Sequence, residues 1–169
     1  PRDDPNLNVP FEKYPYELWQ KTISENLNSV FTCCQKFGKI MVKQKNGSII
    51  NISSIYGIVG PDQRIYGKSR LNSPVYYSAT KGAIVNLTKY LASYWGKNNV
   101  RVNTLTLGGI YDKKLHADKK FVKKYSEKTM LGRMSQASDY DGAILFLASD
   151  LSSYMTGANL IVDGGWTAW

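Results

Sequence analysis

The chain has 169 residues, enough for one domain with a sizeable hydrophobic core, and it contains no apolar run long enough to span a membrane. Lys and Arg total 22 against 13 Asp and Glu residues, which gives a formal net charge of +9. The only cysteines, Cys33 and Cys34, are adjacent and have no third cysteine to pair with, so we expect a reducing compartment, the cytoplasm.

Much of the positive charge lies between Lys113 and Lys128, where lysines recur. Such a segment either binds an anionic partner or forms the solvated side of a helix. The sequence has no RNA-recognition motif, zinc-finger spacing or basic-zipper pattern, so we expect no nucleic-acid partner. The single histidine, His116, also lies here, which argues against a Ser–His triad and against a His-ligated metal site.

The N-terminal part of the chain predicts a lead-in, a helix and a strand. The first 15 residues are polar and rich in Pro and Asn, which indicates irregular structure. Apolar side chains at helical spacing then predict a long helix over residues 16–45. A β-branched run predicts a buried strand over residues 48–53, with Ser54 at its C-terminal end. Open α/β sheets place their reacting groups at that edge, so Ser54 is a candidate site residue.

A long loop is expected over residues 55–72. It holds four of the glycines and prolines of the chain and three cations, namely Gly57, Gly60, Pro61, Gly67, Arg64, Lys68 and Arg70. Loops of this length in compact domains are often functional, so this one could form a substrate rim whose cations bind a phosphate or carboxylate. A solvated excursion without a function is the alternative.

A second long helix is predicted over residues 75–94, with Ser73 as its N-cap and Gly96 at its end. Tyr77 and Lys81 are four residues apart in this helix, so both side chains project from one face.

The remaining pattern alternates strands and helices with short connections. It predicts a strand over residues 100–106, a tight loop over 107–112, a Lys-rich helical segment, a helix over 137–149 capped by Ser135 or Ser138, and a last strand over 158–162. Such alternation predicts an α/β fold with parallel strand pairing.

A strand whose last residue carries a hydroxyl group, here Ser54, followed by a Tyr/Lys pair on a helix, suits the interconversion of a carbonyl and an alcohol. A phenol has a pKa near 10, so it needs a shift of about three units, or about 4 kcal/mol, to act as general acid and base near pH 7. A lysine cation about 4 Å away contributes about 4 kcal/mol at an effective dielectric constant near 20. Lys81 can therefore activate Tyr77 in a partly dry cleft, while Ser54 donates a hydrogen bond to the carbonyl oxygen of the substrate.

Several further motifs accompany the Tyr/Lys pair in one order along the chain. They are Asn26-Leu-Asn-Ser-Val-Phe31, Gly47-Ser-Ile-Ile-Asn-Ile-Ser-Ser54, Tyr77-Ser-Ala-Thr-Lys81-Gly, Asn99-Val-Arg-Val-Asn103, Gly108-Gly109, Phe146-Leu-Ala-Ser-Asp150, and Thr156-Gly157 through Asp163-Gly-Gly165. Over nearly the whole chain this set closely resembles the classical short-chain dehydrogenase/reductase family. The resemblance implies a Rossmann-type, doubly wound parallel sheet and an oxidoreductase that uses NAD or NADP on a small carbonyl or alcohol substrate.

The resemblance also implies roles for individual residues. Tyr77 matches the catalytic acid/base, and Lys81 matches the residue that lowers its pKa and binds the ribose of the cofactor. Ser54 matches the serine that orients the substrate, and Asn26 matches the asparagine that holds a proton-relay water. A further set matches the loop over the nicotinamide, namely Gly108, Gly109 and Ile110. The segment after Ser54 is similar to members that modify flagellin or surface glycans, which implies a sugar or nucleotide-sugar substrate.

The chain departs from the family pattern in three respects. Leu107 stands where members normally have proline, and Asp112 where they often have threonine, so Asp112 either repels a cofactor phosphate or faces water. The Gly-rich turn that binds the cofactor pyrophosphate is missing from the sequence. We therefore expect residues 1–169 to be the C-terminal two-thirds of a single Rossmann-type domain, a piece that is inactive alone and binds dinucleotides poorly.

Two other hypotheses stay open beside the oxidoreductase. Because of Leu107, Asp112 and the missing turn, the chain could be a non-catalytic scaffold or binding module with a dehydrogenase-like fold. Nucleic-acid binding through the basic surface would reveal itself by a steep salt dependence. The resemblance further implies a homodimer or homotetramer that associates through the two long helices, residues 16–45 and 75–94.

Overall fold

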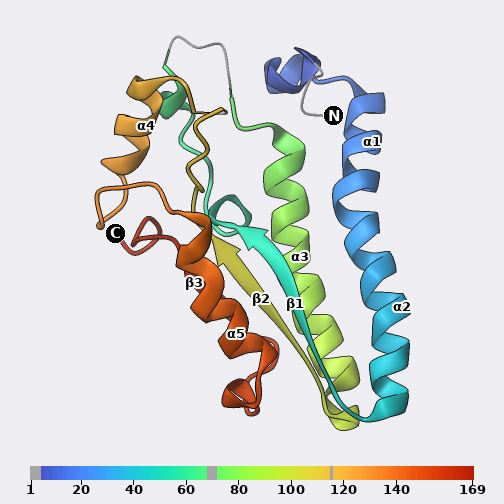
Figure 1. Ribbon diagram of the computed structural model, residues 1–169. Coiled ribbons are helices and arrows are strands. Elements are labelled where there is room, and N and C mark those ends of the chain that lie inside the picture. Colours follow the sequence, from blue (N-terminus) through green and yellow to red (C-terminus); the bar gives the residue numbers. More distant parts are fainter. Residues whose placement is uncertain (1–4, 68–71, 115) are drawn as a thin grey trace.

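The computed structural model describes residues 5–67, 72–114 and 116–169 (Figure 1). Its helices and strands are α1 (Tyr16–Ile23), α2 (Ser29–Gln44), β1 (Gly47–Ser54), α3 (Val75–Trp95), β2 (Val100–Leu107), α4 (Lys119–Ser126), α5 (Asp141–Ala148) and β3 (Asn159–Val162). Lys68 and Arg70, two of the three loop cations singled out in the sequence, lie outside the described residues.

The strands form a parallel sheet in the order β1-β2-β3. β1 and β2 pair along their whole length, from Gly47 opposite Val100 to Ser54 opposite Leu107, so both strands end at the same edge. Helices α2 and α3 cover one face of this sheet and α5 lies against the other (Figure 1). The predicted α/β fold with parallel pairing is thus confirmed.

β2 is the most deeply buried strand. It lies between two layers of helices, and strands covered on both faces are typically rich in β-branched residues, as β2 is. Val102 and Leu105 are completely buried. On the α2–α3 face, Val102 packs in a cluster with Cys34 and Leu91. A second cluster surrounds Ile55 and Trp166 beyond the C-terminal edge of the sheet. The first cluster packs α2 and α3 against the sheet, and the second lies at the edge where the candidate residues are found.

The first long helix contains a π-helical turn that the sequence pattern did not predict. α1 and α2 are joined without a break by the π turn Ser24–Asn28, which includes Asn26. A π turn inserts one extra residue into a helix and is frequent at functional sites.

Three predicted helix ends differ from the structure. The N-cap of α3 is Pro74, one residue after the predicted Ser73. Gly96 has right-handed helical angles, and the chain turns only at Asn99, which adopts a left-handed conformation with φ of 57°. Neither Ser135 nor Ser138 caps the helix near residue 140, because the short 3₁₀ turn before α5 begins after Gln136.

The Lys-rich segment is partly tied to the long loop rather than simply solvated. Lys128 forms an ion pair with Asp62 at 2.7 Å, and Lys124 donates to the carbonyl of Arg64 at 3.2 Å. These contacts fasten the C-terminal end of α4 to the loop that follows β1. None of the helices within residues 5–67, 72–114 and 116–169 combines the length and apolar character that a bilayer crossing requires.

Candidate active site

Three of the predicted residues line one cavity at the C-terminal edge of the sheet. Ser54, Tyr77 and Lys81 all border this cavity, which has a volume of about 490 Å³. The volume lies within the range of small-molecule sites, about 300–1,000 Å³. The strand–helix arrangement therefore brings the hydroxyl, the phenol and the ammonium to one place.

Ser54 is the last residue of β1 and is buried. Its Oγ accepts a hydrogen bond from the backbone N–H of Tyr56 at 3.3 Å. A hydroxyl that accepts in this way still has its own proton to donate. Ser54 can therefore donate to an oxygen atom placed in the cavity.

Tyr77 and Lys81 lie one turn apart on α3, as their spacing predicts. The Nζ atom of Lys81 lies 5.7 Å from the centre of the Tyr77 ring. It also donates a hydrogen bond of 3.0 Å to the carbonyl of Ile52, which fixes the side chain across the end of β1. Burial lowers the pKa of Lys81. An ammonium has three donors, so two stay available to the phenol or to a ligand.

The turn after β1 and the helix α3 are in backbone contact. A Cβ atom on Gly57 would lie 2.6 Å from the carbonyl carbon of Lys81 and 2.7 Å from Ser53 Oγ. Ser53 Oγ itself donates to the Lys81 carbonyl at 2.8 Å. Only a residue without a side chain fits at position 57, and this close approach sets the distance between the Ser54 turn and the Tyr77/Lys81 face.

Asn26 is not among the residues that border the cavity. It is half-buried in the π turn, which packs against α3, and its amide donates to the carbonyl of Thr22 at 2.8 Å. Its predicted part in a proton relay stays a prediction, because the structure brings the other three residues together without it.

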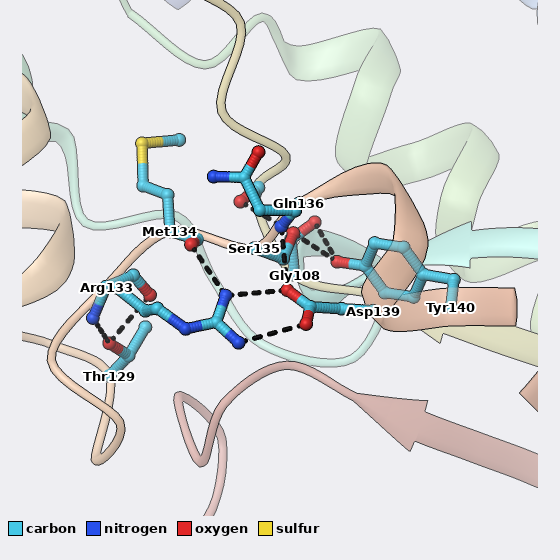
Figure 2. A network of polar contacts seen from close by, with 9 residues as sticks. Gly108, Thr129, Arg133, Met134, Ser135, Gln136, Asp139 and Tyr140 are labelled. Carbon is cyan, nitrogen blue, oxygen red and sulfur yellow. Dashed lines mark hydrogen bonds and ion pairs between the residues drawn. The ribbon is translucent and has the colours of Figure 1, made fainter. Parts of the chain in front are cut away.

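The predicted nicotinamide loop borders the same cavity through Gly108, Gly109 and Ile110. Its backbone is held by side chains that the sequence pattern did not single out. The N–H of Gly109 donates to Tyr125 Oη at 2.5 Å, and its carbonyl accepts from Ser135 Oγ at 3.1 Å. Tyr140 Oη donates to the carbonyl of Gly108 at 3.2 Å (Figure 2). The loop is therefore fixed in place before any ligand binds.

An ion pair supports the segment that carries Ser135. Arg133 donates to both carboxylate oxygens of Asp139, at 2.6 and 2.9 Å, and to the carbonyl of Met134 at 3.2 Å (Figure 2). The backbone N–H of Gln136 also donates to Asp139, at 2.7 Å. The Arg133 guanidinium, followed by this N–H, lowers the pKa of the Asp139 carboxyl to about 2.

We expect this ion pair to make the stability of the protein depend on pH in acid. An aspartate in an unfolded chain has a pKa of about 3.9, above the value of about 2 in the folded protein. The pair therefore stabilises the fold fully above pH 4 and progressively less as the pH falls toward 2. Thermal unfolding measured between pH 5 and 3 should show a smaller decline for Asp139→Asn than for the parent. Equal declines would contradict the assignment.

Comparison with known proteins agrees with this geometry. The family described as enoyl-(acyl carrier protein) reductase matches residues 3–167. A short-chain dehydrogenase from Leptospira borgpetersenii serovar Hardjo-bovis, solved with bound NAD⁺, superposes with a TM-score of 0.85 at 40% identity, over 94% of this chain and 60% of that one. The chain belongs to the short-chain dehydrogenase/reductase family.

Curated members of the short-chain dehydrogenase/reductase family include two similar proteins. Post-translational flagellin modification protein A of Campylobacter coli is 35% identical over 158 residues, 94% of this chain and 60% of that protein. Sorbose reductase of Candida albicans is 37% identical over 166 residues, 98% of this chain and 55% of that protein. The chain thus spans less than two-thirds of the length of these family members.

The two substitutions in the family pattern have local structural roles. Leu107 continues β2 and pairs with Val162 of β3. The Asp112 carboxylate accepts from the N–H of Lys114 at 2.7 Å, so it organises its own turn instead of only facing water.

The expectation that Arg64 binds a substrate anion is not supported. Arg64 donates two hydrogen bonds to Asp62, at 2.8 and 2.9 Å. This pair and the adjoining Lys128 lower the pKa of the Asp62 carboxyl. A guanidinium that is already matched to a carboxylate in this way holds the loop together rather than offering its charge to a ligand.

Aromatic side chains form much of the cavity wall of this family member. The phenols of Tyr56, Tyr66 and Tyr125 border the cavity, and burial raises the pKa of each. They stay neutral near pH 7 and contribute hydroxyl groups and ring faces rather than negative charge. Spacing along the chain did not reveal them, because they come from three separate segments.

Proposed function

We propose that the protein transfers hydride between a nicotinamide cofactor and a small carbonyl or alcohol substrate. The observation that carries this proposal is the convergence of Ser54, Tyr77 and Lys81 on one cavity, opposite the Gly108–Gly109 loop. Similarity to dehydrogenases over nearly the whole chain supports it.

In the proposed reaction Ser54 donates a hydrogen bond from its hydroxyl group to the carbonyl oxygen, keeping its own proton, and so stabilises the negative charge that develops there. The Tyr77 phenol gives its proton to that oxygen in reduction and takes it back in oxidation. Lys81 favours the phenolate, since a cation stabilises the charged form of a nearby acid. Its contact with the Ile52 carbonyl keeps the ammonium at the same end of β1.

The cofactor, NAD or NADP, supplies or accepts the hydride when bound. The residues present fit its nicotinamide–ribose end, because the hydrogen bonds around Gly108 and Gly109 fix the loop and Lys81 keeps two donors free for ribose hydroxyls. Tyr77 would contact the ribose from the same face of α3, and Ile110 would line the nicotinamide. The sequence offers no Gly-rich turn for the pyrophosphate.

For the substrate we propose a sugar, a polyol or a nucleotide-sugar, with a role in surface-glycan synthesis. Two similarities support this class, one to a sorbose reductase and one to a flagellin modification protein. The cavity is lined by phenols and backbone groups that can bind hydroxyls. For the compartment we propose the cytoplasm, since Cys33 and Cys34 are both free.

We further propose a homodimer or homotetramer that associates through α2 and α3. Large apolar side chains on these helices are exposed instead of buried in the core, namely Phe31, Phe37, Ile40, Tyr90 and Tyr94. Exposed apolar residues gathered on neighbouring helices are typical of an association surface.

The decisive experiment is oxidation of NADH and NADPH by the full-length protein with a panel of keto-sugars. We expect turnover with at least one member of the panel, measured as the loss of NADH or NADPH absorbance. If the protein binds NADH without oxidising it in the presence of any panel member, a non-catalytic scaffold explains the fold better. Retention on DNA that weakens steeply with salt would instead support nucleic-acid binding.

A further inference from the structure

Four aromatic rings are stacked in a column beside the cavity. Tyr66 stacks on Phe121 at 5.4 Å between ring centres, Phe121 on His116 at 5.7 Å, and His116 on Tyr111 at 6.0 Å. The rings come from the loop after β1, from α4 and from the segment after β2. Three of them, Tyr66, Phe121 and His116, border the cavity that holds Ser54 and Tyr77.

The contacts at Nδ1 of His116 indicate which ring nitrogen carries the proton. The backbone N–H of Asp112 donates to Nδ1 at 2.9 Å, and the Asp112 carbonyl, which already accepts from the backbone N–H of His116 at 2.8 Å, lies 3.1 Å from the same nitrogen. The shorter contact comes from a backbone amide, which can only donate, so Nδ1 acts as the acceptor and the neutral imidazole has its proton on Nε2. Stacking between Phe121 and Tyr111 holds the plane of the ring.

The Nε2–H of His116 has no protein acceptor among residues 5–67, 72–114 and 116–169. The side chain is half-buried and borders the cavity, so its second nitrogen is a donor available at the cavity wall. A pocket built with such a donor discriminates strongly against ligands that lack a matching acceptor.

We propose that His116 is a specificity-determining residue that donates its Nε2–H to a hydroxyl group of a polyhydroxylated substrate. The inference rests on the proposed function, because it places this hydroxyl on the molecule whose carbonyl faces Ser54 and Tyr77. The aromatic column contributes an apolar surface for the C–H face of the same substrate. His116 acts in recognition and takes no part in the proton transfer.

Two variants of His116 distinguish the effect of its Nε2–H donor from the effect of its aromatic ring. His116→Phe keeps an aromatic ring in the column and removes the donor, whereas His116→Gln keeps an N–H donor of similar reach. The substrates are L-sorbose and 2-hexanone, which has a six-carbon chain and a ketone but no hydroxyl. For His116→Phe we expect KM for L-sorbose to rise about tenfold or more with kcat within about twofold, and kcat/KM for 2-hexanone to change little. His116→Gln should recover part of the loss.

Equal losses on both substrates would mean that His116 only supports the fold, and no loss on either would mean that it contacts no substrate. Both results would overturn the proposal.

A binding measurement distinguishes failure of this inference from failure of the proposed function. In the full-length protein labelled with ¹⁵N-histidine, the signal that disappears in His116→Phe belongs to His116. We expect its Nε2 to be protonated and to shift on addition of L-sorbose, but not of 2-hexanone. A shift without any turnover would uphold the recognition role while refuting hydride transfer. Turnover of L-sorbose without a shift would refute the recognition role alone.

Discussion

Tyr77→Phe is expected to reduce turnover by the full-length protein to about a hundredth or less of the parent value. The substitution removes only the phenolic oxygen, and loss of a general acid–base group costs about 10²–10⁴-fold in rate. The affinity for NADH should change little, because Lys81 and the Gly108–Gly109 loop keep their positions and Tyr77 would supply only one further contact to the ribose. Steady-state kinetics and isothermal titration with NADH measure the two quantities separately.

Tyr90→Phe is the matched control for this variant. Tyr90 lies on the same helix, its side chain is 62% exposed, and it does not border the cavity. It should retain the parent rate. Activity of Tyr77→Phe above about a tenth of the parent value would contradict the assignment of Tyr77 as the proton donor.

Gly57→Ala is expected to damage both stability and catalysis, although position 57 carries no chemical group. The new methyl group would lie 2.6 Å from the carbonyl carbon of Lys81, and backbone cannot move aside as a flexible side chain can. Overpacking of this kind typically costs about 1–3 kcal/mol in the free energy of unfolding. The turn must move away from α3, and displacement of a catalytic group by about 1 Å can cost about 10²-fold in rate.

Gly60→Ala provides the control within the same loop. A Cβ atom at Gly60 would have no neighbour within 4 Å, and neither glycine has a positive φ. Chemical denaturation and kcat/KM of the two variants should therefore differ clearly, with Gly60→Ala close to the parent. Equal behaviour of the two variants would show that the distance between the turn and α3 is not fixed by Gly57.

Local sequence patterns predicted the strands and the placement of Tyr77 and Lys81 on one face of a helix. The β-branched run before Ser54 and the alternating run after Asn99 each identify a strand to within one or two residues. The spacing of Tyr77 and Lys81 predicts a shared helix face, because helical periodicity depends on nearby residues alone. Ser54 follows from the rule that parallel sheets carry reacting groups at their C-terminal edge.

The features that were missed depend on contacts between distant residues. Tyr125 and Tyr140 bind the backbone of the Gly108–Gly109 loop across separations of 16 and 32 residues, and no local pattern marks either one. The sequence predicts a serine cap for the helix near residue 140, whereas the structure begins the turn after Gln136. The N–H of Gln136 is bound by the carboxylate of Asp139, which Arg133 holds in place through an ion pair that no local pattern reveals. In the sequence His116 is one polar residue in a lysine-rich stretch, and only the fold brings its ring between Tyr111 and Phe121.

The aromatic column has a consequence for how the protein can change over time. Proton transfer is assigned to β1 and α3, whereas the column draws its rings from the loop after β1, from α4 and from the segment after β2. Mutations in these peripheral segments can alter which molecule is accepted while the reaction itself is inherited intact. Directed evolution toward new substrates should therefore begin at Tyr66 and Phe121, which border the cavity.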